Sequence, residues 1–211
     1  IIDVSLWKTS GHYDNFRENM YFTSVDEREY AVKPMNCPSH CVIFSTGKHS
    51  YRDLPIRLAD FGRLHRYERS GVTHGLTRVR TFCQDDAHIF CAPDQMKSEM
   101  AAFLALIREV YQVFGFTEMR VALSTRPEKR LGSDEIWDAG EGALAEAMTE
   151  AGMAFHINPG EGAFYGPKIE FQVLDALKRP WQLGTLQVDY SMPARFGLKF
   201  TKSDGTEEAP V

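Results

Sequence analysis

The sequence predicts an α+β fold with a mainly antiparallel β-sheet flanked by helices. Two observations support this fold class: strand patterns follow one another through short turns, and the helical patterns stand apart from them instead of alternating with them. The 211 residues and the 43% hydrophobic content suffice for one buried core, so residues 1–211 are predicted to form a single domain. A doubly wound parallel sheet is not expected, because it needs strands and helices in alternation.

Two segments have clear helical patterns. In residues 93–116, PDQMKSEMAAFLALIREVYQVFGF, apolar residues recur at spacings of three and four, which is typical of a helix that faces a core. Gly115 stands where a left-handed residue ends many helices. A second helix is predicted from Ser133, whose hydroxyl can cap it, to about Gly152, with Asp134 and Glu135 favouring its positive N-terminal end.

The remaining patterned segments are predicted strands. They are short, rich in β-branched and aromatic residues, and bounded by turn residues. The predicted strands span residues 21–25, 30–33, 56–68, 77–91, 119–124, 154–157, 168–174, 183–190 and 198–201.

The segment LTRVRTFCQDDAHIF, residues 76–90, has an unusual composition for a strand. Side chains alternate between the two faces of a strand. One face would be mostly small or apolar, and this face is predicted to pack against a helix. The other face would carry Arg78, Arg80, Phe82, Gln84, Asp86, His88 and Phe90.

Residues 56–68 and 77–91 are predicted to pair as an antiparallel hairpin across RSGVTHG. The pairing would bring Arg66 and Glu68 beside Arg78 and Phe82. Two guanidiniums suit a polyphosphate, and a phenyl ring can stack on a base. On the hairpin alone, a surface ion pair between Arg66 and Glu68 with Phe82 in the core is the simpler alternative. The full polar face favours a binding site.

Composition and motifs exclude several classes of protein. The net charge of −5 and the pI near 5.8 argue against a global nucleic-acid-binding surface, so any RNA contact must be local. The four cysteines form no C-x-x-C pair, and no signal peptide or membrane span is present, which favours a cytoplasmic protein without membrane contact. The glycine-rich GEGAFYGPK lacks the spacing of a P-loop or a Rossmann fingerprint, and no G-x-S-x-G or H-E-x-x-H motif occurs.

The segment HRYERSG…HGLTRVRTFCQDDAHIF resembles motif 2 of class II aminoacyl-tRNA synthetases. Together with LWKTSGH, KPMNCPSH, SYRDLPIRLADFG, STRPEKRLGSDEIWD and GEGAFYGPKIEF, it closely resembles threonyl-tRNA synthetases over almost the whole chain. The resemblance implies the antiparallel class II catalytic core. It also implies a threonine–tRNA ligase that uses ATP to form threonyl-adenylate and transfers L-threonine to the 3′ end of tRNA(Thr), as a homodimer in the full-length protein.

The resemblance also implies roles for particular residues. Arg66 would bind the α-phosphate and the amino-acid carboxylate and, with Lys168, act in catalysis. Glu68 would read the adenine amino group, Arg78 would hold the γ-phosphate, and Phe82 would stack under adenine. Mg²⁺ should accompany the ATP. The remaining expected contacts are Met35, Gln84, Asp86 and Tyr165 around the amino acid, and Gln182 and Thr185 near the nucleotide.

Cys37 and His88 are the candidate zinc ligands. From spacing alone, a buried cysteine and a hydrogen-bonded histidine are the simpler interpretation. The resemblance implies that both bind one zinc ion per catalytic site, with a third ligand expected beyond Val211, and that zinc assists the selection of threonine. The other histidines considered, His40, His65 and His74, are expected to be structural.

The resemblance marks the chain as part of a larger enzyme. Motif 3, with its ATP-binding arginine, and the anticodon-binding domain are missing from residues 1–211, and motif 1 survives at most as residues 1–4. The chain alone is therefore expected to be an incomplete enzyme. Two alternatives stay open: a synthetase-like module that binds tRNA without catalysis, and a prolyl-tRNA synthetase, which would share the hairpin.

Overall fold

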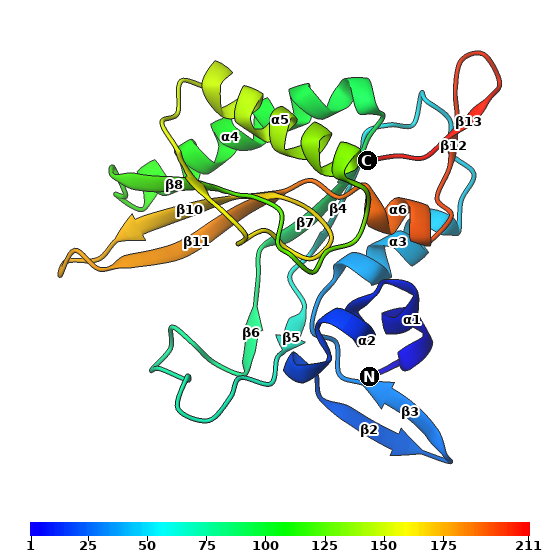
Figure 1. Ribbon diagram of the computed structural model, residues 1–211, viewed down its shortest axis with the longest axis horizontal. Helices are drawn as coiled ribbons and strands as arrows, with labels where there is room; N and C mark the ends of the chain where they lie inside the picture. Colours follow the sequence, from blue (N-terminus) through cyan, green and yellow to red (C-terminus); the bar gives the residue numbers. More distant parts are fainter. The chain divides into compact units, whose positions relative to one another are not determined.

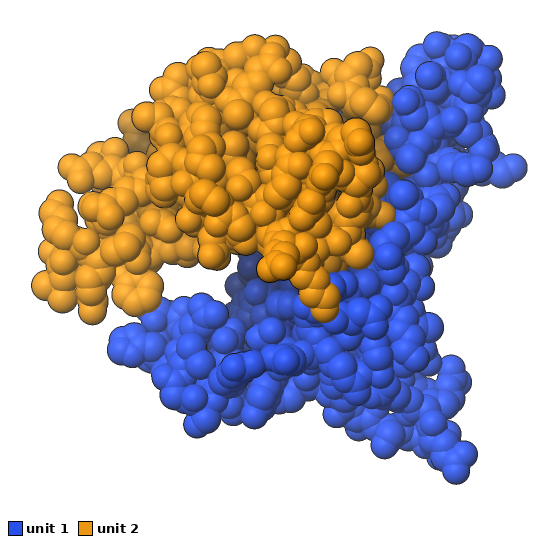
Figure 2. All heavy atoms as spheres, in the orientation of Figure 1, with its two compact units in different colours: residues 1–90, 192–209 blue, residues 91–191, 210–211 orange.

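The computed structural model describes residues 1–211 and divides the chain into two compact units. Unit 1 comprises Ile1–Phe90 and Met192–Ala209, and unit 2 comprises Cys91–Ser191 and Pro210–Val211, as Figure 2 shows by colour. Helices accompany strands that pair antiparallel in every ladder except one, so the α+β prediction is confirmed. That these residues act as a single catalytic domain stays a prediction.

Unit 1 is built from short helices and short strands (Figure 1). A three-stranded sheet has the order β1-β3-β2, and Trp7, Met20 and Ala31 form a buried cluster beside it. The elements of this unit are β1 (Ile2–Asp3), α1 (Val4–Thr9), α2 (His12–Asn15), η1 (Arg17–Asn19), β2 (Phe22–Val25), β3 (Arg28–Ala31), α3 (Cys37–Ser45), β4 (Ile56–Asp60), β5 (Arg63–His65), β6 (Thr81–Cys83), β7 (Asp86–Phe90), β12 (Phe200–Thr201) and β13 (Glu207–Glu208). Helix α6 (Ser191–Arg195) begins at the boundary between the units.

The predicted hairpin forms, but both of its arms are interrupted. Strand β4 pairs with β7, and β5 pairs with β6, both antiparallel. Residues 61–62 interrupt one arm and residues 84–85 the other, so the register is the same on both sides of the break. The backbone N–H of Arg66 donates to the carbonyl oxygen of Arg80 at 3.0 Å and extends this register by another step. The strands expected over 56–68 and 77–91 are therefore shorter than predicted.

The carboxylate of Asp60 explains the break. Its Oδ1 accepts the backbone N–H of Gly62 at 2.5 Å, and its Oδ2 accepts from Nζ of Lys33 at 2.8 Å. A side chain that bonds the backbone two residues ahead competes with the ladder hydrogen bonds of a strand. A Cβ atom at Gly62 would lie 2.5 Å from Oδ1 of Asp60, so a larger residue there would displace the carboxylate from this position.

The face of residues 77–91 that packs against a helix is not the predicted one. Asp86, His88 and Phe90 contact residues of α3 and of its N-cap, whereas Cys83 and Ala87 on the small-residue face are exposed. The prediction was wrong because α3 was not foreseen. Its sequence CPSHCVIFS has no one-sided apolar pattern, and its N-terminal half presents polar side chains to the strand.

Unit 2 is a four-stranded sheet with the order β11-β10-β8-β9. Figure 1 shows α4 and α5 on the same side of this sheet, where Leu104, Leu144, Ile169 and Phe171 join one buried cluster. Within the whole chain, no helix is both long enough and apolar enough to cross a membrane. The elements of this unit are η2 (Pro93–Gln95), α4 (Met96–Val113), β8 (Met119–Ser124), α5 (Asp134–Glu150), β9 (His156–Asn158), β10 (Lys168–Leu174) and β11 (Pro180–Gln187).

Most predictions for unit 2 are confirmed, although β9 and β11 have other bounds than the strands predicted over residues 154–157 and 183–190. Strands β8 and β10 have the predicted bounds, and both long helices form where the sequence predicts them. Gly115 follows the end of α4 with φ +77°, as a left-handed C-terminal residue should. Ser133 has an extended conformation before α5, but its hydroxyl does not bond the helix backbone. Hydrogen bonding to Ser133 instead lowers the pKa of Glu135.

Gly166→Ala should destabilise the protein by about 3 kcal/mol, because the added Cβ would overlap the carbonyl oxygen of Val188. Gly142→Ala is the matched control, since Gly142 is an exposed position in α5 with open space around it. This change should stabilise the helix by about 0.5–1 kcal/mol. Urea unfolding of both variants measures the effects. Equal changes in both variants would contradict the steric argument.

Candidate functional site

The guanidinium of Arg66 is held in place by contacts on several sides. Its Cζ lies 5.1 Å from the ring centroid of Phe82 and 5.7 Å from that of Phe16. Its Nε donates to the carbonyl oxygen of Pro34 at 3.2 Å. Cation–π contacts and a fixed hydrogen bond restrict the rotamers of arginine, so the fork of Arg66 is pre-oriented. The predicted proximity of Arg66 and Phe82 is confirmed.

Glu68 and Arg78 continue the same side of the hairpin. Oε2 of Glu68 accepts from Nε of Arg78 at 3.2 Å, with the glutamate side chain 14% exposed and the arginine 58% exposed. Arg80 donates from Nε and Nη2 to the backbone carbonyl of Glu68 at 3.0 and 2.7 Å, and its Cζ lies 5.1 Å from the ring centroid of Tyr67. The predicted pairing of Glu68 with Arg78 is therefore confirmed, although both arginines lie outside regular strand.

Three side-chain contacts join α3 and its N-cap to β7. Four residues of a helix advance about 6 Å and two residues of a strand about 6.7 Å, so every fourth residue of the helix can meet every second residue of the strand. The contacts are a hydrogen bond of 2.9 Å from Nδ2 of Asn36 to Oδ2 of Asp86, a hydrogen bond of 2.8 Å between Nδ1 of His40 and Nδ1 of His88, and stacking of Phe44 on Phe90 with centroids 4.7 Å apart. They fix the orientation of Asp86 and His88, two predicted site residues.

Asn36 was not predicted, and it is almost fully buried at 1% exposed. Its amide donates to Asp86, whereas its Oδ1 has no hydrogen-bond partner in the structure. Buried amide oxygens normally have a partner, so this atom can accept a hydrogen bond. Asn36 precedes Cys37 in the motif KPMNCPSH, and this motif is the only feature of the sequence that points to Asn36 as a site residue.

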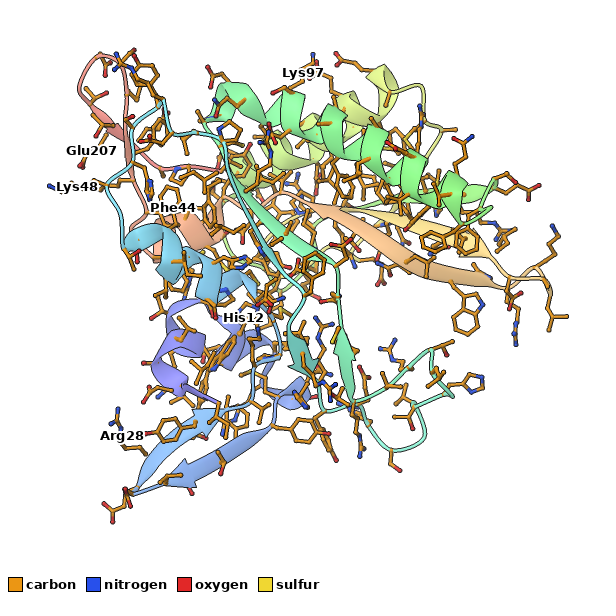
Figure 3. All side chains as sticks on the ribbon, turned by 180° about the vertical axis from the view of Figure 1, so that it is seen from behind. His12, Arg28, Phe44, Lys48, Lys97 and Glu207 are labelled. Carbon is orange, nitrogen blue, oxygen red and sulfur yellow. The ribbon has the colours of Figure 1, made fainter.

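His12 is a second site residue that the sequence did not predict. Its ring is fully buried in unit 1 (Figure 3), with Nδ1 2.8 Å from Oγ of Ser10 and Nε2 2.9 Å from Sδ of Met35. Burial and, to a smaller extent, the charge of Arg66 lower the pKa of His12 to about 4. The histidine is therefore neutral at pH 7. It contacts Met35 and responds to the charge of Arg66, and only the motif LWKTSGH marks it in the sequence.

Cys37 and His88 offer suitable donor atoms for zinc, but no complete ligand set. Burial lowers the pKa of His88 and of His40, and the neutral imidazole is the form that binds a metal. A protein zinc site needs at least three ligands from the protein. Residues 1–211 contain no cluster of three His, Cys, Asp or Glu side chains that could hold a metal ion.

The polar face of the unit 2 sheet carries the predicted residues of that unit. Nζ of Lys168 lies 2.7 Å from Oε1 of Glu170, whose Oε2 accepts from Oγ of Ser124 at 2.6 Å. Two further contacts are those from Nε2 of Gln182 to Oγ1 of Thr185 at 3.0 Å and from the hydroxyl of Tyr165 to Oε1 of Gln187 at 2.5 Å.

The predicted site residues divide between the two units. Gln84 lies exposed in the break between β6 and β7. Unit 1 holds Met35, Cys37, Arg66, Glu68, Arg78, Phe82, Gln84, Asp86 and His88. Unit 2 holds Tyr165, Lys168, Gln182 and Thr185.

Comparison with known proteins identifies the family. Residues 21–211 match the model of the tRNA synthetase class II core domain (G, H, P, S and T). The chain belongs to this family. A threonine–tRNA ligase from Bdellovibrio bacteriovorus is 61% identical over all 211 residues, which make up 32% of that protein. The chain thus spans about a third of the length of the curated relative it matches.

Solved structures agree with this assignment to the class II core. A crystal structure titled as the RNA binding domain of threonyl-tRNA synthetase from Cryptosporidium parvum has a TM-score of 0.95 at 50% identity, over 99% of this chain and 52% of that one. A Giardia lamblia prolyl-tRNA synthetase has a TM-score of 0.70 at 16% identity, over 99% of this chain and 37% of that one, so it shares the fold alone. The predicted resemblance to threonyl-tRNA synthetases and the predicted class II fold are confirmed.

The neutral, buried His12 of this class II core should make stability depend on pH. The unfolded histidine binds a proton near pH 6.5 and the folded one near pH 4, so stability is lost as the pH falls between these values, by about 3 kcal/mol. His12→Gln should be less stable than the wild type at pH 7, and the difference should shrink at pH 4.5. Urea unfolding at pH 7, 5.5 and 4.5 measures it, with exposed His156→Gln as the control. A constant difference across this range would refute the assignment.

Proposed function

We propose that the full-length protein is a threonine–tRNA ligase that activates threonine with ATP to threonyl-adenylate and transfers it to the 3′ end of tRNA(Thr). The observation that carries this proposal is the 61% identity, over every residue of the chain, to a threonine–tRNA ligase. The pre-oriented guanidinium of Arg66 beside Phe82 supports it, because adenylate formation needs a fixed cation at the reacting phosphate and a surface for the base.

In this proposal, Arg66 binds the α-phosphate and the carboxylate of threonine. Attack of the carboxylate on the α-phosphorus forms the acyl-phosphate bond, breaks the bond to the β-phosphate and releases pyrophosphate. Negative charge increases on the phosphate oxygens during this step, and a guanidinium that is already oriented stabilises this charge without reorganisation. Phe82 stacks under adenine, Glu68 accepts from the adenine amino group, and Arg78, whose side chain is exposed, reaches the γ-phosphate. Mg²⁺ accompanies ATP, because the polyphosphate carries more charge than two arginines neutralise.

The polar face of unit 2 carries further residues with roles in the proposal. Lys168 binds the reacting phosphate or carboxylate as a point charge, and Tyr165 binds the amino acid. Gln182 and Thr185 bind the nucleotide, and their mutual hydrogen bond fixes the orientation of both side chains.

For the choice of threonine, we propose contacts from Met35, Gln84 and Asp86 together with a zinc ion held in part by Cys37 and His88. Zinc with an open position would allow chelation by the amino and hydroxyl groups of threonine, which valine cannot provide. Asn36 orients the carboxylate of Asp86 for a hydrogen bond to the substrate.

Two further properties of the full-length protein belong to this proposal. It acts as a homodimer, and it works in the cytoplasm, where tRNA is aminoacylated. Light scattering on the purified full-length protein tests the first, and a monomer at working concentration would contradict it.

Amino-acid-dependent pyrophosphate exchange by the full-length protein tests the proposed function. Threonine should support exchange, serine should do so measurably, and proline and valine should give almost none. Exchange with proline alone would identify a prolyl-tRNA synthetase. A protein that binds tRNA and exchanges with no amino acid would be the non-catalytic module.

The zinc proposal predicts that Cys37→Ser and His88→Ala each lose metal and threonine activation together in the full-length protein. The chelated hydroxyl should give discrimination against valine of about 10⁴-fold, whereas an apolar pocket gives only about 10²-fold. Elemental analysis and pyrophosphate exchange measure both properties. Cys83→Ser, at an exposed position of β6, is the matched control. A metal-free variant that still prefers threonine to valine would disprove the role of zinc.

Arg66→Lys and Phe82→Ala should give different kinetic signatures. The lysine keeps the charge but loses the two-pronged donor, so kcat should fall by about 100-fold. Loss of the ring should mainly raise KM for ATP, by roughly tenfold, because it removes a stacking contact. Tyr67→Ala removes a similar ring beside Arg80 and should leave both parameters near wild type. If both site variants lowered kcat and raised KM for ATP to the same extent, misfolding would be the explanation instead.

A further inference from the structure

Glu170 is a buried carboxylate at the centre of the polar face of the unit 2 sheet. It lies in β10, which is flanked by β8 and β11, and its residue is 6% exposed. Its two oxygens have different partners: Oε1 lies 2.7 Å from Nζ of Lys168, and Oε2 accepts from Oγ of Ser124 at 2.6 Å. A weaker hydrogen-bonding contribution from Gln182 of β11 also lowers the pKa of this carboxyl group. One side chain therefore connects three strands.

The ionised form of Glu170 is the stable one. Burial by itself would raise the pKa of the carboxyl group, but hydrogen bonds from Lys168 and Ser124 outweigh this effect and lower it. A buried charge costs several kcal/mol unless it is paired and hydrogen-bonded, and here it is both. The arrangement holds the ammonium group of Lys168 against an anion that Ser124 orients from the other side.

A β-bulge places Gln182 on this face. The register between β10 and β11 shifts between Phe171 and Gln172, where β11 contains one extra residue. Without the extra residue, side-chain alternation would direct Gln182 toward the helices, because each step along a strand changes the face. With it, Gln182 lies opposite Gln172, on the same face as Glu170. Two of the proposed substrate contacts, Lys168 and Gln182, thus depend on one carboxylate.

A free lysine side chain has four rotatable bonds and loses about 2 kcal/mol of rotamer entropy when it is fixed. Pairing with Glu170 fixes Lys168 before any substrate binds. Of the three N–H donors of the ammonium group, one serves Glu170 and two remain for a substrate anion. Ser124 is fully buried and fixes the carboxylate in turn.

We propose that Glu170 is a positioning residue for the reaction: it holds Nζ of Lys168, and through the same carboxylate Gln182, in the geometry that binds the reacting phosphate or carboxylate group. This inference rests on the proposed function, since it assumes the contact between Lys168 and the substrate. Glu170 does not touch the substrate and acts through Lys168. A carboxylate with a purely structural role would affect only the stability of the sheet.

A double-mutant cycle on the full-length protein tests the proposal through threonine-dependent pyrophosphate exchange. Glu170→Gln keeps the size of the side chain but removes its charge, and it should lower kcat on the order of tenfold. In the Lys168→Ala background the same change should have almost no further effect, because the group that Glu170 positions is gone. Ser124→Ala leaves the Lys168–Glu170 pair in place, so it should lower kcat by only a few fold.

Val173→Ala controls for loss of stability, since Val173 is buried on the other face of β10. Urea unfolding should show a stability loss in this variant without a lower kcat.

Losses from Glu170→Gln and Lys168→Ala that multiply in the double mutant would overturn the inference and leave the proposed function intact. A fully active Lys168→Ala would overturn both the inference and the assigned role of Lys168. If another amino acid supports exchange, the proposed function fails, and the same cycle run with that amino acid decides the inference.

Discussion

The unbroken register of the antiparallel hairpin is the constraint on which unit 1 depends. Because side chains alternate with a period of two, a slip of one residue would move every side chain of an arm to the opposite face. The two arms lose the same number of residues at the break, so β4 with β7 and β5 with β6 keep one register. Arg66 therefore meets Phe82, and Glu68 meets Arg78, although the arginines of the second arm lie outside regular strand.

The second constraint in unit 1 is the match between a helical turn and two residues of a strand. It lets α3 and its N-cap bind β7 at three successive positions, of which the first two are polar and the last is aromatic. Polar groups inside a fold are favourable only when they are hydrogen-bonded, and these contacts satisfy that condition for Asp86 and His88. The stacked Phe44 and Phe90 supply the apolar part of the same contact.

Unit 2 carries apolar side chains on one face of its sheet and polar side chains on the other. The apolar face is covered by α4 and α5, which provide the buried cluster. The polar face carries Lys168, Glu170 and the side chains that the bulge in β11 turns toward them. Burial of the Glu170 carboxylate costs free energy, but this cost is reduced because Ser124 and Lys168 bond its two oxygens.

The sequence by itself determined the elements whose signals are local: helices α4 and α5, strands β8 and β10, the hairpin pairing of Arg66 with Phe82, and the class II resemblance. Periodicity and turn residues suffice for the helices, the strands and the hairpin, because each depends on residues that lie near one another in the chain, whereas the class II resemblance rests on matching motifs. Only the tertiary structure decided the break at Asp60, the helix face that meets β7, the burial of His12 and Asn36, and the central position of Glu170. These features come from contacts between residues far apart in sequence, where a polar side chain is stable in the interior only because a distant partner satisfies it, and no local pattern records that partner.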